Sequence, residues 1–250
     1  MLLAKKIIAE FPDESTVGRY IEVFGGGGSV LFAKNLHKLE IYNDANKELV
    51  NLFRCMKYHR NELEKEISGY INSREVFYEV RERLENGVGF TDIQRAAMFF
   101  IKTKISYGAD GRTFGCNKKN ISADRFEEIS QRLKNVVIEN KDFENLIKVY
   151  DRPDALFYCD PPYHTTEGFY DVKFTEEDHF RLKNALDNIK GKFILSYNDD
   201  EFIRNLYKDY TIIETERQNN LSKGSYKELI IKNFWYIFFR VKITDTVNLL

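Results

Sequence analysis

Cysteine is scarce in this chain, and the cysteines that are present form no paired motif. Cys55, Cys116 and Cys159 are odd in number, far apart and without any C-x-x-C spacing. Disulfide-built domains and thiolate zinc sites need even-numbered or closely spaced cysteines. We therefore expect neither a disulfide framework nor a bound metal.

Long uninterrupted apolar runs are also missing. The apolar stretch over residues 230–241 is broken by Lys232 and Arg240, so we expect no segment that spans a bilayer. The first eleven residues carry Lys5 and Lys6 inside an apolar periodicity and show no small-residue cleavage site, which argues against a secretory signal. The sequence predicts a cytoplasmic protein with no membrane contact.

An excess of positive charge is lacking as well. The chain has 38 Lys and Arg residues against 39 Asp and Glu residues, a formal net charge of −1. Nucleic-acid affinity therefore cannot come from bulk charge and would need a local basic patch. With 250 residues, 43% of them hydrophobic and 31% charged, the chain has the composition of a globular protein with a sizeable core.

The apolar patterns predict alternating strands and helices. An amphipathic helix ends at Pro12, and a β-rich segment, residues 20–24, runs into four glycines and a helix start at Ser29. A strand over 39–42 and a helix over 45–56 follow, and after a break the alternation resumes. The later elements are strands over 136–138, 155–159 and 192–196, a helix over 176–188, and a hairpin over 210–215 and 229–240.

The break in this alternation divides the chain. Residues 57–135 are charged and mostly helical in pattern, which indicates an inserted helical subdomain. We expect a catalytic domain formed by 1–56 and 136–250, of the α/β class with a largely parallel, doubly wound sheet.

Two features at predicted strand ends indicate a nucleoside-bearing cofactor. Gly25 to Gly28 follow the first strand, where glycine lets the backbone approach a ligand closely, although a plain tight turn would look the same. Asp44 ends the second strand about 20 residues later, where a carboxylate can accept hydrogen bonds from ribose hydroxyls. Asn43 and Asp44 could instead cap the following helix.

The most specific motif is Asp160-Pro161-Pro162-Tyr163, directly after the apolar strand over 155–159. Two prolines fix φ and remove two donors, so they form a stiff turn with free carbonyls. The exocyclic N6 of adenine is a poor nucleophile until both its N–H groups point at fixed acceptors. The Asp160 carboxylate and the Pro161 carbonyl could supply these acceptors, with Tyr163 stacked on the base.

With these residues, the chain resembles the Dam-type, or D12 class, of DNA adenine-N6 methyltransferases along nearly its whole length. The family's glycine motif matches residues 22–27, its Asn-Asp pair matches Asn43-Asp44, and its Asp-Phe pair matches Asp142-Phe143. The resemblance implies a Rossmann-like methyltransferase sheet, S-adenosylmethionine as cofactor and double-stranded DNA as substrate. It implies cofactor binding by Phe24, Gly26, Gly27, Asp44, Asp142 and Phe143, and catalysis by Asp160, Pro161 and Tyr163.

The family places its target-recognition subdomain where the helical insert falls here. Positive charge is concentrated there, and we expect these residues to neutralise phosphates, with Arg112 on a glycine-flanked loop able to reach a base edge. For any single lysine a solvated surface is the alternative. The predicted DNA-binding residues are Lys102, Lys104, Arg112, Lys118 and Lys119, with Arg125 nearby.

Several departures and alternatives accompany the resemblance. Relatives usually begin with a Gly-Gly-Lys or Gly-Asn-Lys segment that contacts the cofactor, and this chain starts after that point; Val23 also replaces a usual proline. The loop over 106–115 follows the pattern of GATC-methylating members only loosely. The alternatives are a weak or inactive DNA-binding relative, methyl transfer to cytosine N4, RNA or a protein amide, and a nicotinamide oxidoreductase. We expect a monomer that extrudes its target adenine from the duplex.

Overall fold

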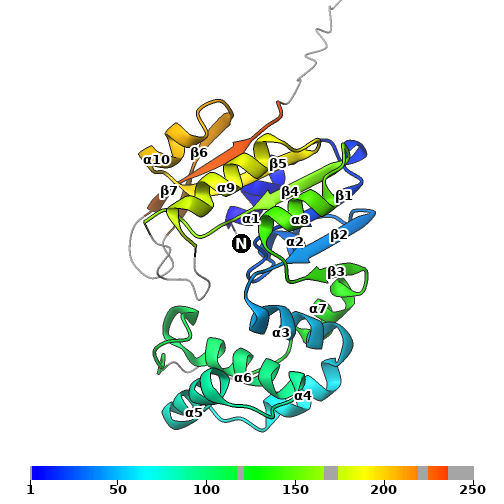
Figure 1. Ribbon diagram of the computed structural model, residues 1–250. Coiled ribbons are helices and arrows are strands. Elements are labelled where there is room, and N and C mark those ends of the chain that lie inside the picture. Colours follow the sequence, from blue (N-terminus) through cyan, green and yellow to red (C-terminus); the bar gives the residue numbers. More distant parts are fainter. Residues whose placement is uncertain (1, 117–120, 166–173, 219–224, 236–250) are drawn as a thin grey trace, which may run out of the picture.

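The described strands form one seven-stranded sheet, seen in the upper part of the molecule in Figure 1. The computed structural model describes residues 2–116, 121–165, 174–218 and 225–235. The strand order is β3-β2-β1-β4-β5-β7-β6; β7 runs antiparallel to β5 and β6, and the other pairs are parallel. The strands are β1 (Arg19–Glu22), β2 (Leu39–Asn43), β3 (Val136–Glu139), β4 (Ala155–Cys159), β5 (Lys192–Asn198), β6 (Thr211–Gln218) and β7 (Ser225–Lys232).

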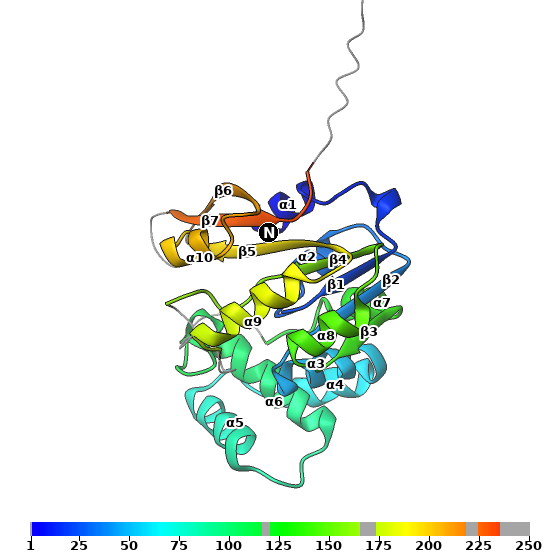
Figure 2. The ribbon, with the colours of Figure 1, turned by 45° about the horizontal axis from the view of Figure 1, so that its top comes forward.

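Helices cover both faces of this sheet, as the two orientations in Figures 1 and 2 show. All five residues of β4 are buried, because alternate side chains enter the apolar layer on each face. One layer includes α8 (Phe143–Tyr150), α9 (Glu176–Asp187) and α10 (Glu201–Leu206). The other includes α1 (Leu2–Ala9) and α2 (Ser29–Ala33), and the short turn η1 (Glu14–Thr16) connects α1 to β1. The chain therefore has the doubly wound α/β fold that its pattern predicts.

Between β2 and β3 the chain leaves the sheet and forms a group of helices, seen below the sheet in Figure 1. α6 packs against α3, α4 and α5, and it begins at a reciprocal capping box between Thr91 and Gln94. The apolar side chains of this group join the sheet layer that contains α1 and α2. The elements are α3 (Lys47–Tyr58), α4 (Arg60–Ser68), α5 (Arg74–Asn86), α6 (Asp92–Ile105), η2 (Tyr107–Ala109) and α7 (Phe126–Leu133).

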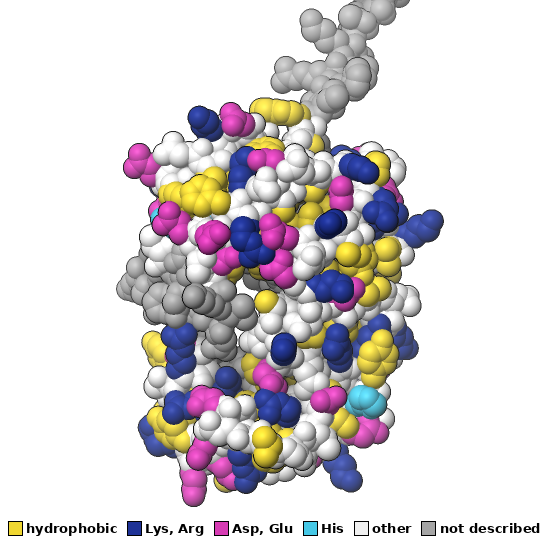
Figure 3. All heavy atoms as spheres, in the orientation of Figure 1, with side chains coloured by type: hydrophobic (Ala, Val, Ile, Leu, Met, Phe, Trp, Pro, Cys, Tyr) yellow, Lys and Arg dark blue, Asp and Glu magenta, His cyan; other side chains and the backbone are white. Residues whose placement is uncertain are grey.

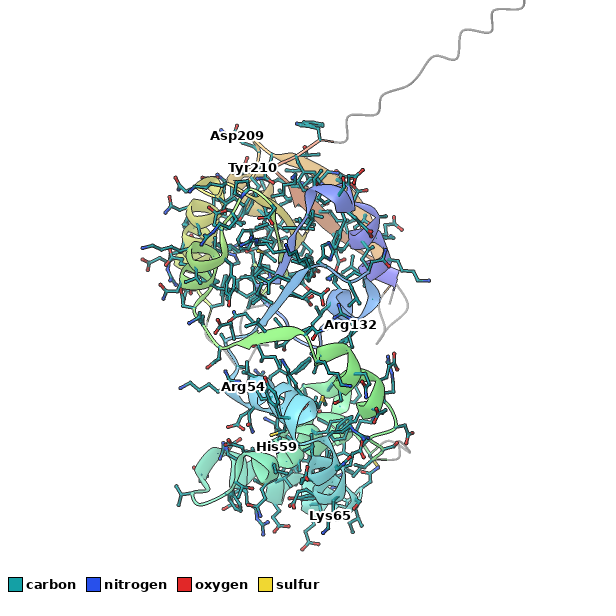
Figure 4. All side chains as sticks on the ribbon, turned by 90° about the vertical axis from the view of Figure 1, so that its right-hand side faces the viewer. Arg54, His59, Lys65, Arg132, Asp209 and Tyr210 are labelled. Atoms are coloured by element: carbon teal, nitrogen blue, oxygen red, sulfur yellow. The ribbon has the colours of Figure 1, made fainter. Side chains whose placement is uncertain are left out.

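A buried ionic cluster ties α7 to the sheet. Arg132 donates from both terminal nitrogens to the Glu40 carboxylate on β2 and also to the Leu31 carbonyl at 2.8 Å. Lys34 contacts the same carboxylate. Burial alone would raise the pKa of Glu40, but hydrogen bonds from Arg132 and Lys34 outweigh it and hold this pKa below its usual value. Figure 4 shows Arg132 at the junction between the sheet and the helical group.

Most predicted elements lie close to the expected residues, although several boundaries differ; two of these differences have a clear cause. The helix predicted over 45–56 begins at Lys47, because Asn46 accepts the first free N–H groups of the helix; capping by Asn43 or Asp44 is therefore wrong. The last strand, predicted over 229–240, begins at Ser225 and ends at Lys232, where Asn233 takes over the pairing with Phe193 and Gly191. Residues 236–240 lie outside the described part.

The division into domains over 1–56, 57–135 and 136–250 stays a prediction. No helix in the described residues is long and apolar enough to cross a membrane. Within the same ranges, no three His, Cys, Asp or Glu side chains gather as metal ligands.

Candidate active site

The carboxyl ends of β1, β2 and β4 meet at one edge of the sheet. The strand order reverses between β1 and β4, and in open α/β sheets this reversal is where ligands bind. The glycine run follows β1, Asp44 follows β2, and Asp160 follows β4. Parallel pairing of these strands therefore brings together the three segments that the sequence singled out.

The glycine run leaves open space at its tip. A Cβ on Gly25 would lie 2.2 Å from the Tyr42 ring, so only glycine fits there. Gly26 has a φ of +49°, and a Cβ on Gly26 or Gly27 would meet no described residue within 4 Å beyond its two chain neighbours. The Tyr42 hydroxyl donates to the Gly26 carbonyl at 2.7 Å and holds the turn. A cofactor could therefore contact the backbone of Gly26 and Gly27 directly.

Asp44 fastens this loop to the start of α3. Its Oδ2 accepts from the Gly26 N–H at 2.8 Å, and its Oδ1 accepts from the Asn46 N–H at 2.7 Å. Burial raises the pKa of Asp44, although both backbone hydrogen bonds oppose that shift. A carboxylate has about four acceptor positions, so two bonds leave capacity for ribose hydroxyls.

Asn43, the other half of the Asn-Asp pair, joins strand ends and is buried. Its side-chain nitrogen donates to the carbonyls of Val23 and Lys141, and its oxygen accepts from the Lys141 N–H. It is 1% exposed, so it has no surface to offer a ligand. Its role is to fix the ends of β1, β2 and β3 relative to one another.

Phe143 and Phe24 pack side by side near the glycine run. Their ring centroids are 5.6 Å apart, and Phe174 contacts both rings. Asp142 caps α8 through the Glu144 N–H and pairs with Arg181 at 3.2 Å. The aromatic group could hold a flat ring, whereas the Asp142 side chain is occupied by contacts within the protein.

The Asp160-to-Tyr163 segment is held from within the fold. Asp160 Oδ1 accepts from the Ser196 hydroxyl at 2.9 Å, and the Tyr163 hydroxyl donates to Glu228 Oε1 at 3.1 Å. Pro161 is buried, and among the described residues its carbonyl accepts no hydrogen bond. The turn therefore presents a carboxylate and a backbone carbonyl next to each other.

A second buried acid, Glu22, lies at the end of β1, in register with Tyr158 of β4. Burial raises its pKa to about 8; hydrogen bonds from the Tyr20 hydroxyl and the Leu31 N–H lower it, and the charge of Asp160 raises it. Folding thus keeps this carboxyl protonated to higher pH, which limits negative charge at the edge of the sheet.

The predicted DNA-binding residues lie in the helical group. Lys102 and Lys104 are half-buried on α6, Arg112 is exposed on the loop that follows, and Lys118 and Lys119 lie outside the described residues. That loop is tightly built: the Ser106 hydroxyl accepts from the Gly111 N–H, and Arg81 donates to the Arg112 carbonyl. Among the described residues on the face in Figure 3, acidic and basic side chains are interspersed.

Comparison with known sequences decides the family. Residues 1–221 match the D12 class N6 adenine-specific DNA methyltransferases. The chain belongs to this family. Its reaction is methyl transfer from S-adenosylmethionine to adenine N6 in DNA, and the open space over Gly26 and Gly27 fits a ligand that binds along backbone. Methyl transfer to cytosine N4, RNA or protein and the oxidoreductase reading are thereby set aside.

Curated relatives agree with this assignment. The type II methyltransferase M1.LlaDCHI of Lactococcus lactis subsp. cremoris is 29% identical, covering 86% of each chain. M.CviBI of Paramecium bursaria Chlorella virus NC1A is 26% identical over 88% of this chain and 91% of its own length. M.MjaIII of Methanocaldococcus jannaschii is 29% identical over 88% and 90%, respectively.

Proposed function

We propose that this methyltransferase uses the turn at Asp160 and Pro161 to activate adenine N6 for direct attack on a sulfonium methyl group. The observation that carries the proposal is the position of Asp160. This residue directly follows β4, and β4 pairs with β1, the strand that leads into the open glycine loop. The Asp160 carboxylate and the open backbone of Gly26 and Gly27 therefore lie at one edge of the sheet, which supports their roles as amine acceptor and cofactor site.

We propose that the cofactor is held by Phe24, Gly26, Gly27 and Asp44. When bound, S-adenosylmethionine supplies an electrophilic methyl group. The two glycines allow close backbone approach, and Asp44 offers its remaining acceptor positions to ribose hydroxyls. Phe143, next to Phe24, contributes an aromatic wall. We assign cofactor contact at Asp142 to its backbone, because its side chain caps α8.

The chain's own residues would prepare the amine. Asp160 accepts one N6 hydrogen and the Pro161 carbonyl accepts the other, so that the nitrogen lone pair is freed from the purine ring and points at the methyl group. The same acceptors stabilise the positive charge that grows on nitrogen during transfer. As the new carbon–nitrogen bond forms, the carbon–sulfur bond would break and release a neutral thioether, and the extra proton on nitrogen would pass to the Asp160 carboxylate that already accepts its hydrogen bond. Tyr163, held by Glu228, offers a ring on which the base can stack.

Such an approach requires the adenine to leave the duplex, because N6 inside the helix cannot meet the cofactor. Contacts from Lys102, Lys104, Arg112, Lys118 and Lys119 to phosphates and base edges would offset the unstacking free energy of a few kcal/mol. We further propose a cytoplasmic monomer, as one chain carries both the sheet site and the helical group. The type II names of the three relatives support a role in restriction–modification.

Substituting the acid tests the proposal. Asp160→Ala should lower the rate of methyl transfer at least about a hundredfold, while S-adenosylmethionine affinity stays nearly unchanged. Asp154→Ala is the matched control, because Asp154 precedes the same strand at its opposite end and pairs with Arg19. Methylation of unmethylated genomic DNA with labelled cofactor reports the rate, and calorimetry reports the affinity. Normal transfer by Asp160→Ala would refute the assigned role.

A further inference from the structure

Beneath the proposed acceptor lies a pair of buried hydroxyl groups that the mechanism above does not use. Ser196 on β5 is fully buried, and its hydroxyl lies 2.9 Å from Asp160 Oδ1. The Tyr158 hydroxyl, from β4, lies 3.1 Å from the same Ser196 oxygen. Tyr158 is 3% exposed. Two neighbouring strands therefore place a short chain of hydroxyls behind the carboxylate.

Strand register explains why these groups meet. Cys159 of β4 is paired with Leu195 of β5, so the next positions along the two parallel strands, Asp160 and Ser196, are neighbours. Tyr158 precedes Asp160 by two residues, and side chains two apart on an extended strand point to the same face. All three side chains thus lie on one side of the sheet, set by backbone pairing.

The direction of each hydrogen bond follows from the chemistry of the groups. An ionised carboxylate only accepts, so the single Ser196 hydrogen goes to Asp160; the alternative acceptor, the Cys159 carbonyl, is more distant at 3.5 Å. The Tyr158 hydroxyl must then donate to the Ser196 oxygen. Burial and the nearby Asp160 charge raise the pKa of Tyr158 well above its usual value, so it remains a donor.

We propose that Ser196, supported by Tyr158, is a positioning residue that fixes the rotation of the Asp160 carboxylate for methyl transfer. This rests on the proposed role of Asp160. The terminal torsion of an aspartate is broad by itself. A charge-assisted bond to Oδ1 sets the plane of the carboxylate and with it the direction of Oδ2, which must be correct before the adenine amine arrives.

Removing the hydroxyl tests this proposal. Ser196→Ala should slow methyl transfer about ten- to a hundredfold in single turnover, because small displacements of a positioned group reduce rates on that scale. The KM for DNA and the affinity for S-adenosylmethionine should stay near wild type, since the serine is fully buried. Single-turnover measurement with enzyme in excess over unmethylated genomic DNA separates transfer from product release.

Two further variants separate positioning from a general loss of structure. Ser196→Thr keeps a hydroxyl and should recover most of the rate, and Tyr158→Phe should cause a smaller loss because Ser196 can still donate. Ser130→Ala is the matched control: it removes a buried serine hydroxyl from α7, outside the site, and should leave the transfer rate unchanged.

The outcomes distinguish the two proposals. If Asp160→Ala abolishes transfer while Ser196→Ala and Tyr158→Phe both transfer within about twofold of wild type, positioning is refuted and the acceptor role stands. A raised KM with an unchanged single-turnover rate would also overturn it. If Asp160→Ala itself transfers normally, the proposed function fails first. A slow Ser196→Ala with recovery in Ser196→Thr supports positioning.

Discussion

Replacing Glu22 by glutamine should change how stability depends on pH. The folded protein holds the pKa of Glu22 at about 8, against a reference value of 4.5. Between these values the folded state keeps a proton that the unfolded state has lost, so this group's contribution to stability is complete below about pH 4.5 and declines as pH rises toward 8. The slope is about 1.4 kcal/mol per pH unit, or about 5 kcal/mol across the interval at most.

Glutamine mimics the protonated acid but does not titrate. The free energy of unfolding of Glu22→Gln, minus that of wild type, should therefore rise from about pH 5 to 8 and become level above it. Urea unfolding at each pH measures both quantities, and taking the difference cancels the other titrating groups. Glu62→Gln, at an exposed position on α4, controls for loss of one acid. A difference that stays flat between pH 5 and 8 would refute the reasoning.

Two further predictions concern cofactor binding and the junction of the fold. Asp44→Ala should weaken S-adenosylmethionine binding about 10- to 100-fold, because it removes ribose acceptors and leaves the Gly26 N–H without its acceptor. If titration with S-adenosylmethionine gives an unchanged affinity, Asp44 does not bind the ribose. Arg132→Ala should lower the free energy of unfolding by about 3–5 kcal/mol, since it breaks a buried ionic cluster, whereas exposed Arg125→Ala should cost less than about 1 kcal/mol. Urea unfolding of both variants measures this contrast.

Local sequence patterns predicted well which segments meet at one edge of the sheet. The glycine run, Asp44 and Asp160 each directly follow an apolar strand, and parallel strands bring their carboxyl ends to one edge. Chain direction alone therefore placed these groups together. The same logic could not decide the finer role of Asn43, because its partners, Val23 and Lys141, are distant in sequence.

Helix caps and strand ends were predicted less well. Asn43, Asp44 and Asn46 are all good capping residues within four positions, so composition does not select among them. The structure selects Asn46 because the Asp44 side chain is engaged by the glycine loop as well as the Asn46 N–H. The last strand was placed too late because its apolar run continues past Asn233, where pairing with β5 changes from backbone to side chain.

The groups that support the site left no signal in the sequence. Ser196 lies 36 residues beyond Asp160, and Glu228 lies 65 beyond Tyr163. A serine in a predicted strand looks like any other small residue, and Glu228 lies just before the strand predicted from Leu229, where an acid is expected to face solvent. Only the register between β4, β5 and β7 shows that both side chains face the catalytic turn.

Glu22 and Asp160, the two acids at this edge, differ in how much water reaches them. Glu22 is 1% exposed and its pKa is raised by burial first, whereas Asp160 is only half-buried and accepts a hydrogen bond from Ser196. Two nearby carboxyls resist being ionised together. Because burial raises the pKa of Glu22 to about 8, this carboxyl carries little negative charge near neutral pH, so the proposed acceptor role of Asp160 does not place two charged carboxylates at this edge.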